Sequence, residues 1–139
     1  MKKLTLRIIS QEEQLLEKKV ESVTAVTTTG QVTILPDHIP LFSQLTYGEL
    51  VYRDGGEEYS FAISKGFLDV DPSDTVTAIV DTAVAARDIS MQKAQEAIQA
   101  ARETMEISED ERELLQAEAS LRQAMLEVQI AQKSKKSSV

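Results

Sequence analysis

Hydrophobic and polar residues alternate over short stretches in the first 85 residues of the chain. Leu4, Leu6 and Ile8 alternate with Thr5 and Arg7, and this period of two is typical of a strand with one buried face. Similar stretches recur, and residues 15–20 lead into the second of them. The pattern predicts strands at about residues 3–9, 22–29, 32–35, 42–45, 49–53, 59–64, 67–70 and 75–80.

Turn-forming residues separate these predicted strands. Asp54-Gly55-Gly56 favours a tight hairpin, because glycine tolerates the positive φ that such turns require. Pro72 has the fixed φ that suits the second position of a turn. Short strands with frequent turns, and no helical pattern between them, are typical of a β-sandwich or barrel, so a parallel α/β sheet is disfavoured.

The pattern changes near residue 85, where β-forming residues give way to Ala, Gln, Glu, Met and Leu. We expect a helix at about residues 88–105, capped by Asp88, and a second at about 109–132, begun by a capping box of Ser108 and Glu111. The expected apolar stripes are Met91, Ala94, Ala97 or Ile98, Ala101 and Met105 on the first helix, and Leu114, Ala117, Leu121, Ala124, Val128 and Ala131 on the second.

Two helices with narrow, alanine-rich stripes and a short loop predict an antiparallel helical hairpin. Alanine buries little apolar area, so we expect the pair to be weakly held. We interpret the chain as a mostly β domain, residues 1–85, followed by the hairpin at 86–139, with a frayed basic tail. The sequence leaves open whether the hairpin is a fixed cap on the β-domain or can open.

Composition narrows the classes of function. The chain has 139 residues, 42% of them hydrophobic, and a net charge of −8, which disfavours binding to a nucleic-acid backbone. It has no cysteine and no apolar run of about 20 residues that could cross a bilayer. Its basic start lacks the apolar stretch of a secretory signal. We expect a soluble, cytoplasmic protein that reaches a membrane only through a partner.

The sequence shows no constellation for catalysis or for a cofactor. It contains no phosphate-binding glycine loop and no nucleophile elbow. Its single histidine, His38, follows Asp37, a pair that is more often a satisfied turn than a catalytic dyad; neither a cysteine nor a second histidine could assist it. We therefore expect no enzyme activity, no metal and no cofactor in the isolated chain.

The most informative stretch runs from Gly30 to Leu41, G-Q-V-T-I-L-P-D-H-I-P-L. Its strand must stop at Pro36, which has no N–H to donate, and Pro40 holds the preceding residue extended. A rigid loop on a β-scaffold is a common place for function. The stretch resembles the signature of the epsilon subunit of the F-type ATP synthase, through Gly30, Ile34, Pro36, His38, Pro40 and Leu41, and then Gly48 and Leu50.

The resemblance extends over about residues 3–132, because a β-sandwich followed by a helical hairpin is also the layout of that family. It implies a non-catalytic subunit on the rotor, peripheral to the cytoplasmic face of the cell membrane, which couples the catalytic head to a proton-translocating c-ring. It also implies that the hairpin can extend to the beta subunit and block ATP hydrolysis. The partner interface with gamma and the c-ring would include Gly30, Gln31, Asp37, His38, Ile39, Pro40 and Leu41, with His38 toward gamma.

The chain departs from the family pattern at the start of the first helix. Several members carry I/L-D-x-x-R-A there, which binds ATP, whereas this chain has Ile89, Ser90, Lys93 and Ala94 at the matching positions. A lysine cannot make the bidentate contacts of an arginine, so we expect weak or absent ATP binding. The second helix is also poorly basic, with Arg112 and Arg122 beside several glutamates, which argues against strong inhibition.

A second interpretation is a stand-alone β-sandwich module that binds a sugar or a peptide. Such modules often present an aromatic platform on one face. This chain has three Tyr, three Phe and no Trp, and Tyr59 and Phe61 follow the alternation of a core strand, which weakens this interpretation. The two interpretations differ in partner dependence: a rotor subunit requires a stable complex with a gamma-like subunit, whereas a stand-alone module does not.

Overall fold

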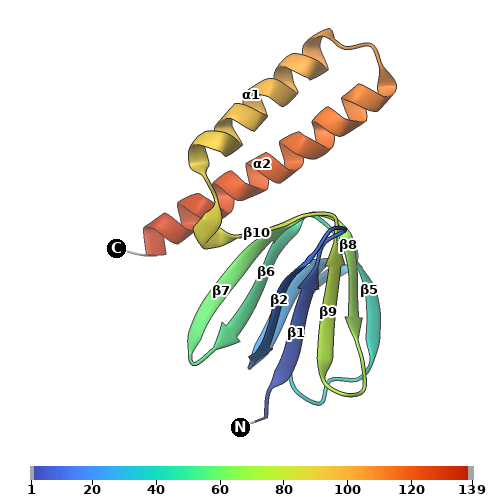
Figure 1. The fold of residues 1–139 in the computed structure, drawn as a ribbon, viewed down its shortest axis with the longest axis vertical. Coiled ribbons are helices and arrows are strands. Elements are labelled where there is room, and N and C mark those ends of the chain that lie inside the picture. Colours follow the sequence, from blue (N-terminus) through green and yellow to red (C-terminus); the bar gives the residue numbers. More distant parts are fainter. Residues whose placement is uncertain (1, 138–139) are drawn as a thin grey trace. The chain divides into compact units, whose positions relative to one another are not determined.

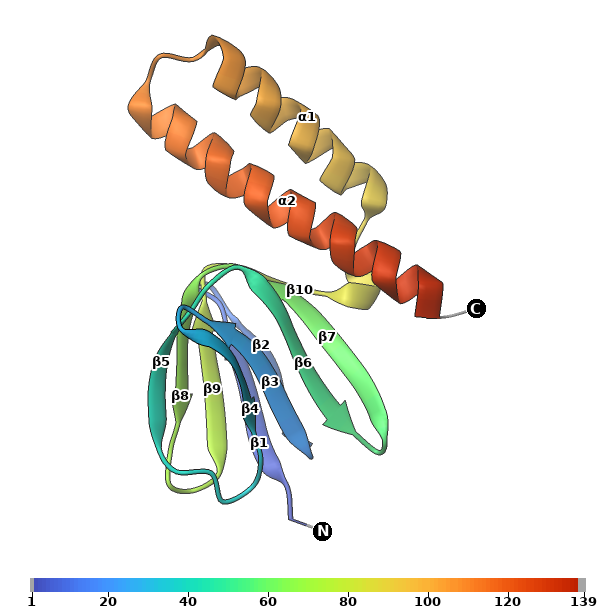
Figure 2. The same cartoon turned by 180° about the vertical axis from the view of Figure 1, so that it is seen from behind.

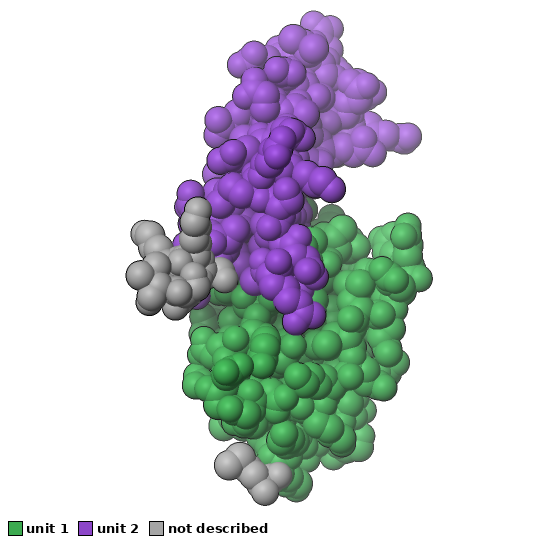
Figure 3. All heavy atoms as spheres, turned by 60° about the vertical axis from the view of Figure 1, so that its left-hand side comes forward, with its two compact units in different colours: residues 1–84 green, residues 85–139 purple. Residues whose placement is uncertain are grey.

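The computed structural model describes the backbone of residues 2–137 and the side chains of residues 2–133. The chain divides into two compact units, Met1–Val84 and Ala85–Val139, shown in different colours in Figure 3. The first unit is built of strands and the second of helices, so the predicted fold class is confirmed.

The first unit is a sheet that closes into a sandwich (Figures 1 and 2). Its strand order is β10-β7-β6-β3-β5-β8-β9-β1-β2, with β4 paired to β3, and β1 and β9 are parallel neighbours. The sheet bends at β3, which divides it into two layers. One layer consists of β5, β8, β9, β1 and β2. The strands are β1 Leu4–Ile9, β2 Gln14–Val20, β3 Ser22–Thr27, β4 Gly30–Ile34, β5 Leu41–Leu45, β6 Gly48–Asp54, β7 Glu57–Ile63, β8 Gly66–Val70, β9 Thr75–Val80 and β10 Ala83–Ala85.

Alternating residues of the strands fill the space between the layers. In β1 the side chains of Leu4, Leu6 and Ile8 are fully buried, whereas the residues between them are half-exposed. This is the pattern expected for strands with one face on a core. The largest fully buried side chains of the unit are Leu4, Leu6, Ile8, Val20, Val23, Ile34, Leu45, Leu50, Ile63, Leu68, Val70 and Val76.

Two strands differ from the sequence expectation. Residues 14–20 form strand β2 rather than a lead-in, and residues 83–85 form the short strand β10. β2 lies at the end of the strand order, beside β1, so polar residues such as Glu17, Lys18 and Lys19 can remain exposed along it. An exposed edge strand has no alternation to detect, which explains why the pattern does not predict it.

The second unit contains a 3-10 turn η1, Ala86–Asp88, and two helices, α1 Met91–Ile107 and α2 Glu111–Ser137. The predicted caps are wrong. Ser90 caps α1, since its hydroxyl accepts the Lys93 N–H at 3.2 Å, while Asp88 belongs to η1. Asp110 takes the capping position of α2, where its carboxylate accepts the Arg112 N–H at 3.1 Å.

Alanines form the contact between the two helices. Ala94, Ala101, Ala117 and Ala124 are buried, as the narrow stripes predict, but Met105 is 41% exposed and does not belong to the stripe. None of the helices described in residues 2–137 is long and apolar enough to cross a membrane.

Candidate functional site: a partner surface on the β-sandwich

The loop between β4 and β5, residues 35–40, has a defined turn at its centre. The His38 N–H donates to the Leu35 carbonyl oxygen at 3.1 Å, and Asp37 between them has a φ of 68°. Pro36 at the second position and a positive φ at the third are the features of a type II turn. Aspartate is among the few residues other than glycine that adopt this conformation readily.

His38 serves this loop locally. Its Nδ1 lies 2.7 Å from the carbonyl oxygen of Ile39, so the ring can donate a hydrogen bond to the backbone. The nearest carboxylate in sequence, Asp37, is engaged by Lys2 instead, in a direct ion pair. His38 and Asp37 therefore each bond to another partner, and their side chains form no hydrogen-bonded pair with each other in the described residues.

The turn between β8 and β9 lies at the same end of the sandwich and binds this loop (Figure 1). The Asp74 carboxylate accepts the Asp37 N–H at 2.8 Å, and it lies 3.8 Å from the ammonium of Lys2. The hydrogen bond and charge of Asp37 raise the pKa of Lys2 above its ordinary value, and Asp74 adds to this effect. Three segments that are far apart in sequence thus meet at the carboxylates of Asp37 and Asp74. They are the start of the chain at Lys2, the β4–β5 loop and the β8–β9 turn.

Asp71 holds the β8–β9 turn itself. Its Oδ1 accepts hydrogen bonds from the Ser73 hydroxyl at 2.7 Å, the Ser73 N–H at 2.9 Å and the Thr75 N–H at 3.1 Å. The Ser73 hydroxyl is the main cause of a pKa of Asp71 that lies below its ordinary value, since these donors favour the charged carboxylate.

We predict that Asp71→Asn lowers the melting temperature at pH 7 and that the difference from the wild-type chain shrinks in acid. A carboxyl with a depressed pKa in the folded chain stabilises it above the unfolded pKa of about 3.9, and this stabilisation is lost as the pH falls through the folded-state pKa. The asparagine variant has no such titration. Thermal unfolding between about pH 7 and 2 measures the difference, and a difference independent of pH would contradict the prediction.

Large apolar side chains are exposed on β5, β8 and β9 as well as on this loop. On β5 and β8 the rings of Phe42 and Phe67 stack with their centroids 5.5 Å apart, on the outward face of the layer. Phe67 pairs across the sheet with Ile79 of β9. We call these three residues, with Leu35 and Ile39 of the loop, the apolar surface; their exposed fractions are 55% for Leu35, 75% for Ile39, 67% for Phe42, 44% for Phe67 and 47% for Ile79.

The structure brings together only part of the predicted interface. Asp37, His38, Ile39, Pro40 and Leu41 lie in the loop or at the start of β5. Gly30 and Gln31 lie at the opposite end of β4, where Gly30 pairs with Thr27. A partner that contacts Gly30 and Gln31 would therefore meet a different part of the sandwich from one that contacts the loop. The sequence analysis missed Phe42, Phe67 and Ile79, whose outward orientation follows from strand register.

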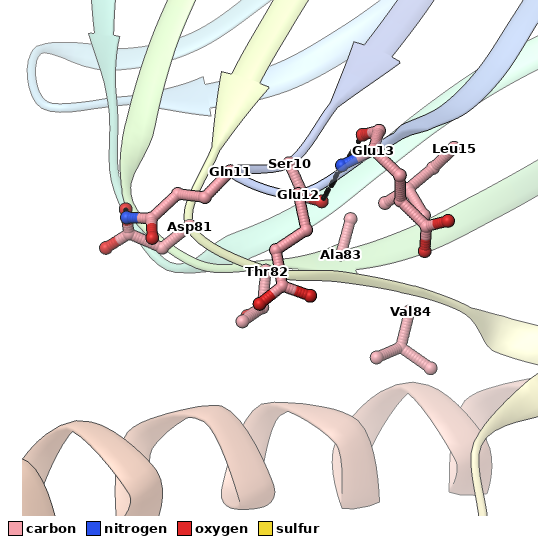
Figure 4. A pocket seen from close by; sticks show the side chains of 9 residues that line it. All are labelled: Ser10, Gln11, Glu12, Glu13, Leu15, Asp81, Thr82, Ala83 and Val84. Carbon is pink, nitrogen blue, oxygen red and sulfur yellow. Dashed lines mark hydrogen bonds between the residues drawn. The ribbon is translucent and has the colours of Figure 1, made fainter.

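A hollow of the sandwich lies between the β1–β2 turn and the segment after β9 (Figure 4). It has a volume of about 470 Å³ and is open to solvent. Gln11 Nε2 donates to Asp81 Oδ1 at 3.3 Å across it, and Glu12 and Glu13 also line it. Within residues 2–137 no three His, Cys, Asp or Glu side chains are grouped to hold a metal ion.

The hairpin residues singled out in the sequence have local roles. The hydroxyl of Ser90 is used by the cap of α1, and Ala94 is buried in the hairpin contact, while Lys93 is exposed. Arg122 forms an ion pair with Glu118 at 3.1 Å, one turn away on α2, and Arg112 is exposed near the start of that helix. The two arginines are about 2.8 turns apart along the helix.

Comparison with known proteins identifies the family. A family model described as the beta-sandwich domain of the ATP synthase delta/epsilon chain matches residues 3–86, more than half of the chain. The chain belongs to this family. The resemblance stated from the Gly30–Leu41 stretch is thereby confirmed.

Relatives named ATP synthase epsilon chain match the same region. That of Dehalococcoides mccartyi is 42% identical over 86 residues, which are 62% of this chain and 61% of that protein. That of Geobacter metallireducens is 33% identical over 84 residues, 60% of each chain. The matched region thus spans about three fifths of the length of these curated relatives of the delta/epsilon family.

Solved structures of mitochondrial ATP synthases contain similar chains. One in the Euglena gracilis complex with OSCP, F1 and the c-ring has a TM-score of 0.74 at 28% identity, covering 89% of this chain and 78% of that chain. One in the central stalk and c-ring of Tetrahymena thermophila has a TM-score of 0.61 at 15% identity, covering 94% and 97%, and shares the fold. The likeness to the Euglena chain therefore extends beyond the β-sandwich that the family model covers.

Proposed function

We propose that this chain is a non-catalytic subunit of the central stalk of an F-type ATP synthase. Its β-sandwich, residues 1–85, would dock on the gamma subunit and the c-ring, which places the chain at the cytoplasmic face of the cell membrane without insertion. The observation that carries the proposal is the apolar surface at Leu35, Ile39, Phe42, Phe67 and Ile79, exposed on the domain that the family model matches. Stacked aromatic rings that stay in water are typical of an interaction site.

The position of this surface favours gamma as its partner. Leu35 and Ile39 lie in the loop that carries His38, and Phe42 follows this loop on β5. The family resemblance assigns His38 to gamma. Gly30 and Gln31, at the other end of β4, would then face the c-ring. Two partners at the two ends of one strand would let the sandwich couple the head to the ring as a rigid body. In the family that the chain resembles, the catalytic head is coupled to proton flow through the c-ring, and we propose the same coupling for this chain.

The second proposed role is regulation by the hairpin, residues 86–139. If it extends toward the beta subunit, Arg112 and Arg122 are its cationic contacts on α2. They lie among Glu111, Glu113, Glu118 and Glu127, so the net charge of this stretch is unfavourable for an acidic docking site. We therefore propose weak inhibition of ATP hydrolysis.

We predict that the chain binds ATP with a dissociation constant above about 1 mM, a free energy weaker than about 4 kcal/mol. Ser90 offers no carboxylate, and its hydroxyl already accepts the Lys93 N–H. Isothermal titration calorimetry measures the binding. The matched control is the double variant Ser90→Asp and Lys93→Arg, which restores the family pattern and should bind more tightly. Tight binding by the wild-type chain would overturn the prediction.

The proposed function is tested by co-purification with the gamma subunit of the same organism, using the full chain and a chain ending at Ala86. Both should bind, and ATP hydrolysis by the head complex should rise slightly with the shorter chain. Equal hydrolysis would leave a coupling subunit whose hairpin is only a cap. Failure of both chains to bind gamma would overturn the proposal and favour the stand-alone sugar- or peptide-binding module.

A further inference from the structure

The β4–β5 loop carries Ile39, the most exposed large apolar side chain described in the sandwich. Few hydrogen bonds hold the backbone of this loop in place. Pro36 and Pro40 have no N–H, and the His38 N–H bonds within the loop to Leu35. In the part of the chain that the structure describes, the bond from the Asp37 N–H to Asp74 is the one backbone hydrogen bond that ties residues 35–40 to another segment. The backbone of the loop is therefore tied to a remote segment by one carboxylate, while Lys2 holds the loop only through the exposed Asp37 side chain.

Asp74 is itself firmly placed. It ends the β8–β9 turn with a φ of 59°, and its carbonyl oxygen accepts the Thr5 N–H of β1 at 2.9 Å. Asp71 braces the same turn through the Ser73 and Thr75 N–H groups. The side chain of Asp74 is thus presented from a rigid turn, on the side where the loop passes.

The bond from Asp74 acts on the residue of the loop that has a positive φ. Asp37 is in the left-handed region, with a φ of 68°, which aspartate adopts more readily than most residues but less readily than the right-handed region. A charged acceptor at 2.8 Å from its N–H is a strong restraint on that conformation. Without it, the turn would exchange with other conformations and Ile39 would lose its fixed direction.

We propose that Asp74 is a positioning residue for partner docking, which holds the β4–β5 loop in the shape that presents Ile39 to the rotor partner. The inference rests on the proposed function. Asp74 lies outside the loop, and the partner need not touch it for it to act in this way. A loop shaped before binding has less conformational entropy to lose when the complex forms, so the restraint contributes to affinity.

The experiment compares full-length chains carrying Asp74→Ala, Asp74→Asn and Lys2→Ala for affinity to the gamma subunit. Amide hydrogen exchange of Asp37 is measured by NMR in each free chain. Alanine removes the acceptor and should weaken binding about tenfold. Asparagine keeps an Oδ1 acceptor, and Lys2→Ala removes only exposed ion pairs, so both should stay within about threefold of wild type.

The exchange measurement separates positioning from general stability. The Asp37 amide should be protected in the wild-type chain and in Asp74→Asn, and should exchange faster in Asp74→Ala, while the melting temperature of the sandwich changes little. Wild-type affinity or unchanged Asp37 exchange in Asp74→Ala would overturn the role of Asp74 alone, as would equal losses for alanine and asparagine. Absence of binding by the wild-type chain would overturn the proposed function and, with it, the docking role.

Discussion

Replacing Phe42 with glutamate is expected to lower the affinity of the chain for the gamma subunit about a hundredfold. Phe42 is 67% exposed and stacks on Phe67, so it lies within the apolar surface rather than in the core. Docking would bury the new carboxylate against an apolar partner, and an unpaired charge in such a place costs about 3 kcal/mol, close to a hundredfold in affinity. Binding of the full-length variant to immobilised gamma measures the effect.

The matched control is Thr33→Glu, which adds the same charge to an exposed position of β4, in the other layer of the sandwich. This variant should bind gamma like the wild-type chain. Both variants should melt within a few degrees of the wild type, because neither side chain supports the core. Equal losses of binding would show that added negative charge, and not the apolar surface, controls the association.

The strand pattern could be predicted from the sequence where one face of a strand is buried. Leu4, Leu6 and Ile8 alternate with polar residues, and β1 follows directly from them. The pattern fails for β2, because the run Glu17-Lys18-Lys19 lies at the end of the strand order, beside β1, and remains in water. Alternation reports burial, so a strand that buries little leaves little trace.

The apolar surface was harder to predict for a related reason. Phe42 and Phe67 look like core residues of short strands, and only the register shows that they point outward. Phe67 shares its row with Ile79, whereas Leu68 and Val70 of the same strand point inward and are buried. Since side chains in a strand alternate between the faces, one step of register decides which hydrophobic residues form the core.

The restraint on the β4–β5 loop illustrates the same limit at longer range. Asp37 and Asp74 are 37 residues apart, and nothing in either local sequence indicates that one carboxylate accepts the other residue's N–H. The predictions of the helix caps were wrong for a more local reason. Asp88, Ser90, Ser108 and Asp110 are all residues that cap well, and the backbone path chooses among neighbours with similar preferences.

Replacing Gly66 with alanine is expected to destabilise the β-sandwich by about 3 kcal/mol, which lowers the melting temperature by roughly 10–20 °C in a domain of this size. A Cβ at Gly66 would lie 2.1 Å from the carbonyl oxygen of Ile79 and 2.8 Å from the Cα of Val80. These are backbone atoms of β9, which pairs with β8 through Gly66 and Val80. Neither can turn aside as a side chain can, so the two strands must separate.

Tyrosine signals make the measurement specific. All three Tyr and all three Phe lie in the β-sandwich sequence and none in the helices, so near-ultraviolet circular dichroism follows the unfolding of the sandwich alone. Gly55→Ala is the control, because its Cβ would meet nothing within 4 Å and only its φ of 63° is unfavourable. That variant should lose about 1 kcal/mol. If Gly66→Ala melted no lower than Gly55→Ala, the close approach of β8 and β9 could not be what requires a glycine at this position.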